Sequence, residues 1–192
     1  MASRDGSGSN LPYYLTALLA LAVIGYAWVQ QDHLQARAIG PGSEAPRFEA
    51  VTLEGVPATL DDYRGKVVLL NIWATWCPPC RYEMPSMQRL YEAIDDPDFE
   101  IVAVSVDARL GERDEDGMPG GNVGAFADSL SLTFPILHDP RGTIRRQYRT
   151  RLLPESYVIG RDGRIYRKVA GATEWDRPQY IDFIERLLAE EV

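Results

Sequence analysis

The sequence predicts an α/β domain in three layers, preceded by one N-terminal transmembrane helix. Residues 66–73 (KVVLLNIW) form a nearly continuous apolar run rich in branched side chains, the pattern of a strand buried on both faces. Residues 78–95 then repeat apolar side chains at steps of three and four, as an amphipathic helix does, and residues 100–106 (EIVAVSV) return to a strand pattern. Strand, helix and strand in this order form a βαβ unit.

The transmembrane helix is predicted over residues 11–29, which carry no charge and would span roughly 28 Å as a helix, close to the hydrocarbon core of a bilayer. Aromatic side chains suited to the two membrane interfaces stand near its ends: Tyr13, Tyr14, Tyr26 and Trp28. The alternative is a signal peptide cleaved after residues 36–38 (ARA). Because the apolar run is longer than a usual signal peptide and ends well before Ala38, we expect a retained anchor after a head of residues 1–10.

The remaining chain is expected to form a polar linker over residues 30–44 and one folded domain over residues 45–192. Residues 107–121 are polar and glycine-rich, which predicts a loop. The other expected elements are a helix near 122–130, a strand near 133–138, a helix near 141–149, a hairpin of 156–160 with 164–170, and a last helix capped by Asp176. Since the head is short, we expect the folded domain on the translocated side of the membrane.

Composition excludes some functions. The 192 residues suffice for one domain and an appendage, and the formal charge of −8 disfavours nucleic acid, whose binding depends on neutralising phosphates. The chain has only two cysteines, Cys77 and Cys80, so it lacks a separate disulfide framework and must be held by its apolar core.

Those two cysteines form a Cys-x-x-Cys motif at the junction of the first buried strand and the following helix. Unpaired N–H groups and a partial positive charge at a helix start stabilise a thiolate, so Cys77 is the predicted nucleophile and Cys80 the resolving thiol. A structural disulfide is disfavoured because its loop would be very short, and zinc usually requires four ligands. We therefore expect no metal and no cofactor besides the redox-active pair.

The domain resembles the TlpA/ResA/CcmG group of thioredoxin-like proteins from residue 40 to about residue 188. The matching segments are 45–48 (APRF), 63–71 (YRGKVVLLN), 73–85 (WATWCPPCRYEMP) and 153–159 (LPESYVI) before 162–163 (DG). The resemblance implies a thioredoxin fold, in which helices flank a central mixed sheet. It also implies thiol–disulfide exchange at the periplasmic side of the cell membrane, often on the cysteines of apocytochrome c.

The resemblance further implies partners and site residues. The expected partners are the membrane, exported proteins carrying thiols or disulfides, and a membrane thiol that donates electrons. The proline matching Pro154 is cis in that group and faces the cysteines, and such a bond leaves backbone groups free to pair with a substrate strand. Trp76, Leu153 and Glu155 are expected to contact substrate, although Trp76 could equally shield the site by packing.

Two charged features have open interpretations. Glu83 lies three residues after Cys80, where it is either a proton shuttle for that thiol or an exposed acid favoured by the helix dipole. The resemblance favours the shuttle. Five arginines lie within residues 141–151 and form either a solvated helix face or a docking patch for an acidic partner.

We expect the chain to be a reductase of disulfides in exported proteins, and three other functions compete with this interpretation. A disulfide-forming oxidase would use the same residues, since direction depends on reduction potential. A peroxidase of the peroxiredoxin type would need Thr three residues before its reactive Cys and Pro four before that, where this chain has Ala74 and Leu70. A binding module could instead deliver Cu(I) through the two cysteines.

Overall fold

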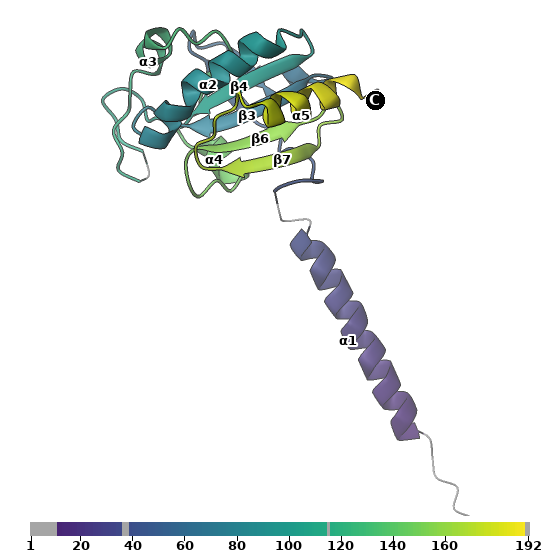
Figure 1. Cartoon of the computed structure of the whole chain (residues 1–192). Helices are drawn as coiled ribbons and strands as arrows, with labels where there is room; N and C mark the ends of the chain where they lie inside the picture. The colour runs from purple at the N-terminus through teal and green to yellow at the C-terminus, as the bar shows by residue number, and fades with distance from the viewer. Residues whose placement is uncertain (1–10, 36–38, 115, 191–192) are drawn as a thin grey trace, which may run out of the picture. The chain divides into compact units, whose positions relative to one another are not determined.

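A computed structural model describes residues 11–35, 39–114 and 116–190, with only the backbone for residues 11, 12 and 29–35. The chain divides into two units, Met1–Ala38 and Ile39–Val192, each of which is described by itself (Figure 1). The predicted head, residues 1–10, lies outside the described residues, as do residues 36–38 of the predicted linker.

The first unit contains one helix, α1 (Leu11–Gln35). The large apolar side chains described along this helix are all exposed; Tyr13 near its start is 76% exposed and Trp28 near its end is 70% exposed. Among the described residues, no helix has both the length and the apolar character needed to cross a membrane. The predicted span 11–29 lies within α1 but begins and ends at residues whose side chains are not described.

The second unit is built on a seven-stranded mixed sheet with the order β2-β1-β5-β4-β3-β6-β7. Strands β3 (Val67–Trp73), β4 (Phe99–Ser105) and β5 (Ile136–His138) are parallel neighbours. Strand β6 (Glu155–Ile159) pairs antiparallel with β3, and β7 (Ile165–Ala170) with β6. This confirms the expected βαβ unit, the C-terminal hairpin and the thioredoxin-like arrangement.

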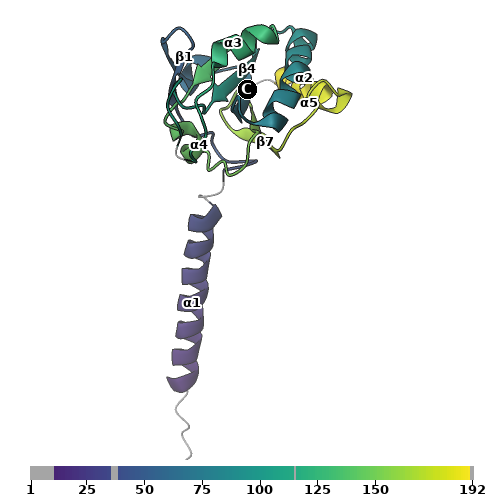
Figure 2. The ribbon, with the colours of Figure 1, turned by 90° about the vertical axis from the view of Figure 1, so that its left-hand side faces the viewer.

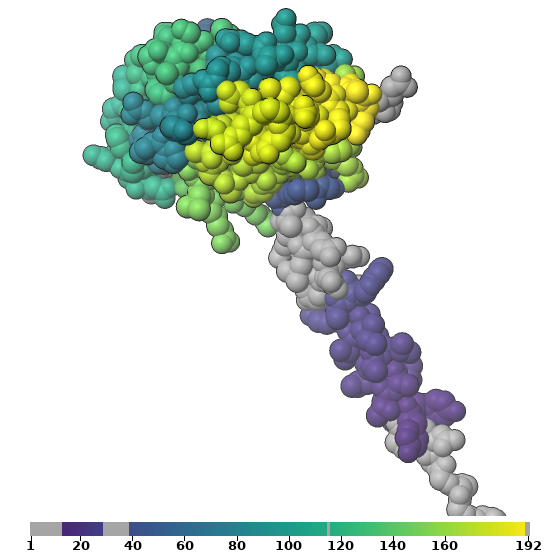
Figure 3. All heavy atoms as spheres, viewed as in Figure 1, coloured from purple at the N-terminus to yellow at the C-terminus, as the bar shows by residue number. Residues whose placement is uncertain are grey.

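Helices cover both faces of this sheet. Helices α2 (Pro78–Ile94) and α5 (Pro178–Ala189) lie side by side on one face, and α4 (Thr143–Gln147) lies on the other (Figures 1 and 2). The atoms of α5 are seen directly beside those of α2 in the space-filling view (Figure 3). Helix α3 (Val123–Ser129) follows the loop that leaves β4.

The core lies between the sheet and these helices, and β3 supplies its centre because all seven of its residues are buried. Full burial of both strand faces explains why the sequence of β3 is continuously apolar apart from Asn71. Helix α2 contributes Met84, Met87 and Leu90 to the same core, which confirms its expected apolar face.

The structure corrects one expectation and adds three elements. The last helix begins at Pro178 with Arg177 at its N-cap, so the capping role expected for Asp176 is wrong; its carboxylate instead accepts a 2.7 Å hydrogen bond from Nε of Arg89. The end of the predicted linker lies against the β6–β7 turn, where the Gly42 N–H donates to the carbonyl of Ile165. Elements not anticipated are β1 (Glu49–Thr52), β2 (Pro57–Thr59) and the 3₁₀ helix η1 (Leu60–Tyr63).

Candidate active site

The cysteines lie where the sequence places them, between the end of β3 and the first turn of α2. Cys77 is the N-cap of α2, and Pro78 and Pro79 occupy its first positions, where a missing N–H leaves no bond unmade. The two cysteines form a disulfide, and Sγ of Cys77 accepts a 3.2 Å hydrogen bond from the N–H of Cys80. This contact shows that the helix start directs a backbone donor at the Cys77 sulfur, as thiolate stabilisation requires.

The two cysteine residues differ slightly in exposure. Cys80 has no exposed surface, whereas Cys77 retains 4% and is flanked by the exposed Pro78 and Pro79. An incoming disulfide therefore meets Cys77 first. The deeper position of Cys80 also raises the free energy of forming its thiolate, because burial disfavours a charged group.

Glu83, one turn after Cys80, is buried with 1% of its surface exposed. Its Oε1 accepts a 2.7 Å hydrogen bond from Nδ2 of Asn71, and its Oε2 accepts a 3.1 Å bond from the N–H of Thr173. Burial raises the pKa of Glu83 to about 7, although both hydrogen bonds oppose the shift. The alternative interpretation of Glu83 as an exposed acid at a helix start is therefore wrong.

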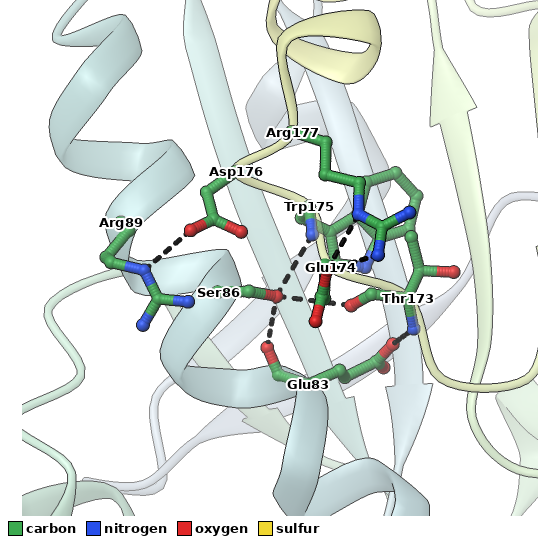
Figure 4. Close-up of polar contacts among 8 residues, drawn as sticks. All are labelled: Glu83, Ser86, Arg89, Thr173, Glu174, Trp175, Asp176 and Arg177. Carbon is green, nitrogen blue, oxygen red and sulfur yellow. Dashed lines mark hydrogen bonds and ion pairs between the residues drawn. The ribbon is translucent and has the colours of Figure 1, made fainter.

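The segment between β7 and α5 encloses this carboxylate (Figure 4). The hydroxyl of Ser86 donates to the carbonyls of Glu83 and Thr173 and accepts a 3.0 Å hydrogen bond from the N–H of Trp175. These bonds fasten residues 173–175 across the first turns of α2. Because the covering segment lies about 90 residues away along the chain, local sequence pattern could not predict that Glu83 is buried.

The peptide bond between Leu153 and Pro154 is cis, which confirms the expectation that the resemblance carried. Pro154 is buried and immediately precedes β6, in which Glu155 pairs with Ile72 near the end of β3. The proline thus stands at the sheet edge that carries the cysteines. Its carbonyl accepts a 2.8 Å hydrogen bond from the Gly171 N–H, so this carbonyl is already paired within the domain.

The three residues expected to contact substrate occupy different environments. Trp76 and Leu153 are half-buried beside the motif and the cis bond. Glu155 is buried, and its carboxylate binds the hydroxyl of Tyr157 at 2.7 Å and Nζ of Lys168 at 3.0 Å. Contact between Glu155 and substrate stays a prediction, and it would require that carboxylate to exchange these partners.

Sequence reasoning missed another buried acid, Asp107, whose carboxylate binds Thr75 in the loop before Cys77. Its Oδ2 accepts hydrogen bonds from the Thr75 N–H at 2.8 Å and the Ser105 hydroxyl at 2.7 Å, and its Oδ1 accepts the Thr75 hydroxyl at 2.5 Å. A Cβ at Gly121 would collide with the same threonine hydroxyl. The available signal was position, because Asp107 follows a buried strand at the carboxyl edge of the sheet.

Within the described residues, no group of three or more His, Cys, Asp or Glu side chains is arranged to hold a metal ion. The chemistry that the site offers on its own is the exchange of one disulfide for another, with a buried carboxylate three residues after the resolving cysteine. Fold and site together define a thioredoxin-like dithiol–disulfide domain.

Known proteins agree with this class. The profile of the AhpC/TSA family matches residues 41–168. The thiol-disulfide oxidoreductase ResA of Geobacillus thermodenitrificans is 37% identical over 169 residues, covering 88% of this chain and 91% of that protein. The thioredoxin-like protein YneN of Bacillus subtilis is 37% identical over 156 residues, covering 80% and 86%.

Solved structures give the same result. StoA of Bacillus subtilis aligns with a TM-score of 0.55 at 25% identity, covering 77% of this chain and 99% of that one. A secreted Mycobacterium tuberculosis disulfide oxidoreductase homologous to Escherichia coli DsbE aligns with a TM-score of 0.58 at 26% identity, covering 74% and 96%. The chain therefore belongs to the AhpC/TSA family and is a thiol–disulfide oxidoreductase of the ResA type.

Proposed function

We propose that this oxidoreductase reduces disulfides in exported proteins, with the Cys77–Cys80 pair as its only redox group. Cys77 attacks the substrate disulfide, forming a mixed disulfide and releasing one substrate thiolate. Cys80 then loses its proton to Glu83 and attacks Cys77, which releases the reduced substrate and leaves the Cys77–Cys80 disulfide. A membrane thiol donor restores the dithiol. Trp76, Leu153 and Glu155 border the substrate, and Pro154 places the backbone of Leu153 beside it.

The observation that supports the reducing direction is that Cys80 and Glu83, three residues apart on α2, are both buried. Burial and a neighbouring carboxylate both disfavour the Cys80 thiolate. Thiolate stabilisation is what makes a pair of this fold strongly oxidising, and among the described residues only one hydrogen bond, from the Cys80 N–H to Sγ of Cys77, is directed at a cysteine sulfur. This limited stabilisation supports the reducing direction.

The test is the reduction potential of the pair, measured by equilibrating the full chain with defined thiol–disulfide couples. The proposal expects a value below about −200 mV, in the range of reductants. A value near about −120 mV would instead identify a disulfide-forming oxidase. Tight Cu(I) binding with poor insulin reduction would favour metal delivery.

We also propose that residues 11–29 anchor the chain in the cell membrane as a single span, with the domain of residues 45–192 on the extracytoplasmic side after a linker of residues 30–44. Support comes from the absence of charge in this segment, from its helical backbone within α1, and from the exposed apolar side chains of residues 13–28. A reporter that is active only after export, fused after Val192, should be active. Activity of a cytoplasmic reporter alone would contradict this topology.

Apocytochrome c is the proposed substrate class, supported by the resemblance to the ResA and CcmG group. Its haem-attachment motif is Cys-x-x-Cys-His. The reduced chain should therefore reduce an oxidised peptide with this motif faster than a peptide in which Gln replaces the His. Equal rates for the two peptides would remove the support for cytochrome c maturation.

A further inference from the structure

A hollow of about 680 Å³ opens beside the active-site edge of the sheet, between the loop of residues 107–121 and the segment of residues 140–151. We call it the arginine hollow, after the six arginines that line it: Arg113, Arg141, Arg145, Arg146, Arg149 and Arg151. The described acidic residues along its wall are Asp114 and Asp116. This concentration of cationic side chains occurs in a chain whose formal charge is −8.

The arginines of residues 141–151 do not form one helix face, which was the simpler interpretation of the sequence. Helix α4 has only five residues, and Arg141 precedes it while Arg149 and Arg151 follow it. The segment wraps around the hollow and is fixed by buried anchors. The carboxylate of Asp139 accepts a 2.6 Å hydrogen bond from the Ile144 N–H, and the Tyr148 hydroxyl donates to the carbonyl of Pro46 at 2.8 Å.

The hollow already binds a carboxylate of the chain itself. Oδ2 of Asp116, in the acidic loop, lies 2.5 Å from Nη1 of Arg145. The other five arginines are exposed, and two of them also donate to backbone carbonyls, Arg113 to Gly117 at 2.6 Å and Arg146 to Arg141 at 2.7 Å. A guanidinium group matches the planar geometry of a carboxylate and binds it through paired N–H donors. The chemistry of the hollow therefore suits a ligand that carries several carboxylates.

Two features place the hollow near the end of the sheet that carries the cysteines. Val106 in its wall donates a 2.9 Å backbone hydrogen bond to the carbonyl of Trp73, the last residue of β3. At the other side, Arg151 lies three residues before Pro154. An extended polypeptide that pairs with Leu153 can thus place neighbouring residues over the hollow, since each residue spans about 3.3 Å.

We propose that the arginine hollow docks an acidic segment of the substrate protein while the substrate disulfide meets Cys77. This inference rests on the proposed function and adds a preference among its substrates, for proteins with Asp or Glu close to the disulfide that is reduced. Opposite charges steer association and select partners, so acidic substrates bind faster than neutral ones at low ionic strength. Outside the arginine hollow, the net negative charge of the chain repels acidic substrates.

Docking is tested apart from redox chemistry by a fluorescent peptide of Glu residues without cysteine, titrated with the oxidised full chain at low salt. Binding should weaken about tenfold between about 20 and 500 mM salt, because screening removes the attraction. The variant Arg141→Glu/Arg151→Glu should lose at least tenfold in affinity. The control Arg47→Glu/Arg186→Glu changes the net charge equally at exposed sites outside the hollow and should lose less than threefold.

Several outcomes would overturn the docking proposal: no binding at low salt, equal losses in both double variants, or displacement by inorganic phosphate far beyond that by chloride at equal ionic strength. The last outcome would identify a site for small anions. A second measurement separates docking from catalysis. The reduced chain should reduce a disulfide peptide flanked by Glu faster than one flanked by Gln. If it reduces neither peptide while the Glu peptide still binds, the proposed function fails and the docking site stands.

Discussion

Nδ2 of Asn71 donates a 2.7 Å hydrogen bond to Oε1 of Glu83, joining the centre of β3 to the helix that carries both cysteines. The same amide donates to the Ser156 hydroxyl at 2.8 Å, so the polar group inside the core links β3, α2 and β6. With a pKa of about 7, Glu83 is close to half ionised at neutral pH. A carboxylate in that state can both accept and return a proton without a large free-energy cost.

The first prediction concerns Glu83→Gln, which keeps the shape of the side chain and removes its acid–base function. Resolution of the mixed disulfide by Cys80 should rise with pH through about 7 in the original chain, because only ionised Glu83 accepts the thiol proton. The variant should lose this rise and resolve about tenfold or more slowly at pH 7.5. Single-turnover release of a peptide from Cys77 across pH 5.5–9 measures it. The control is Glu92→Gln, which changes an exposed acid on the same helix and should leave the pH profile unchanged. If the pH profile of Glu83→Gln superimposes on that of the original chain, another group accepts the proton of Cys80.

The second prediction concerns stability and pH. Because folding raises the pKa of Glu83 from 4.5 to about 7, the folded chain holds this proton more tightly than the unfolded chain. Between these values the unfolded chain binds fewer protons, so the contribution of Glu83 to the free energy of unfolding falls as pH rises, by about 3 kcal/mol in total. Urea unfolding of the oxidised chain at pH 4.5 and 7.5 should show this fall, and Glu83→Gln should lack it. Identical pH dependence in both would mean that Glu83 titrates normally.

The third prediction tests the contact between Asn71 and Glu83. The hydrogen bond from Asn71 holds the pKa of Glu83 down against burial. Asn71→Leu, which has a similar volume and no donor, should move the midpoint of the resolution profile upward by about one pH unit. Ser156→Ala is the matched control, since it alters the other partner of the same amide. A midpoint that stays in place or falls would show that this bond does not set the ionisation of Glu83.

The fourth prediction concerns Asp107 as a positioning residue. Asp107→Asn keeps the volume but leaves one of three donors without its acceptor, so the free energy of unfolding should fall by about 1–3 kcal/mol. The Thr75 loop should loosen, and the reaction of reduced Cys77 with iodoacetamide should shift its pH midpoint. Ser105→Ala, which removes one donor and leaves the carboxylate, should move that midpoint less. Unchanged thiol reactivity with lower stability would limit Asp107 to a structural role.

The sequence was sufficient to predict the parts of the fold whose pattern is local. Strand β3 is continuously apolar, α2 repeats its core residues at helical spacing, and the cysteines mark their junction. Strands β1 and β2 were not predictable because they have only four and three residues. Strand β1 pairs with β5, far along the chain, and β2 pairs with β1. The environment of Glu83 was equally hidden, since Thr173 covers it from the segment after β7.

The environment of the arginines in residues 141–151 also could not be predicted from the sequence. Its composition indicated a charged surface, but the expected helix over 141–149 shortened to five residues. The hollow exists only because the loop of residues 107–121 folds against the run, through contacts such as that between Asp116 and Arg145. A loop without periodic pattern gives no sequence signal for its partner.

The most direct test of the whole account is the trapping of mixed disulfides by single cysteine variants of the full chain. Cys77 stands at the helix start with residual exposure and a backbone donor on its sulfur, whereas Cys80 is fully buried. Cys80→Ser should therefore accumulate covalent complexes with exported proteins, separable by non-reducing electrophoresis and released by a reductant, while Cys77→Ser should form few or none. Equal trapping by the two variants, or trapping by Cys77→Ser alone, would contradict the assignment of Cys77 as the nucleophile.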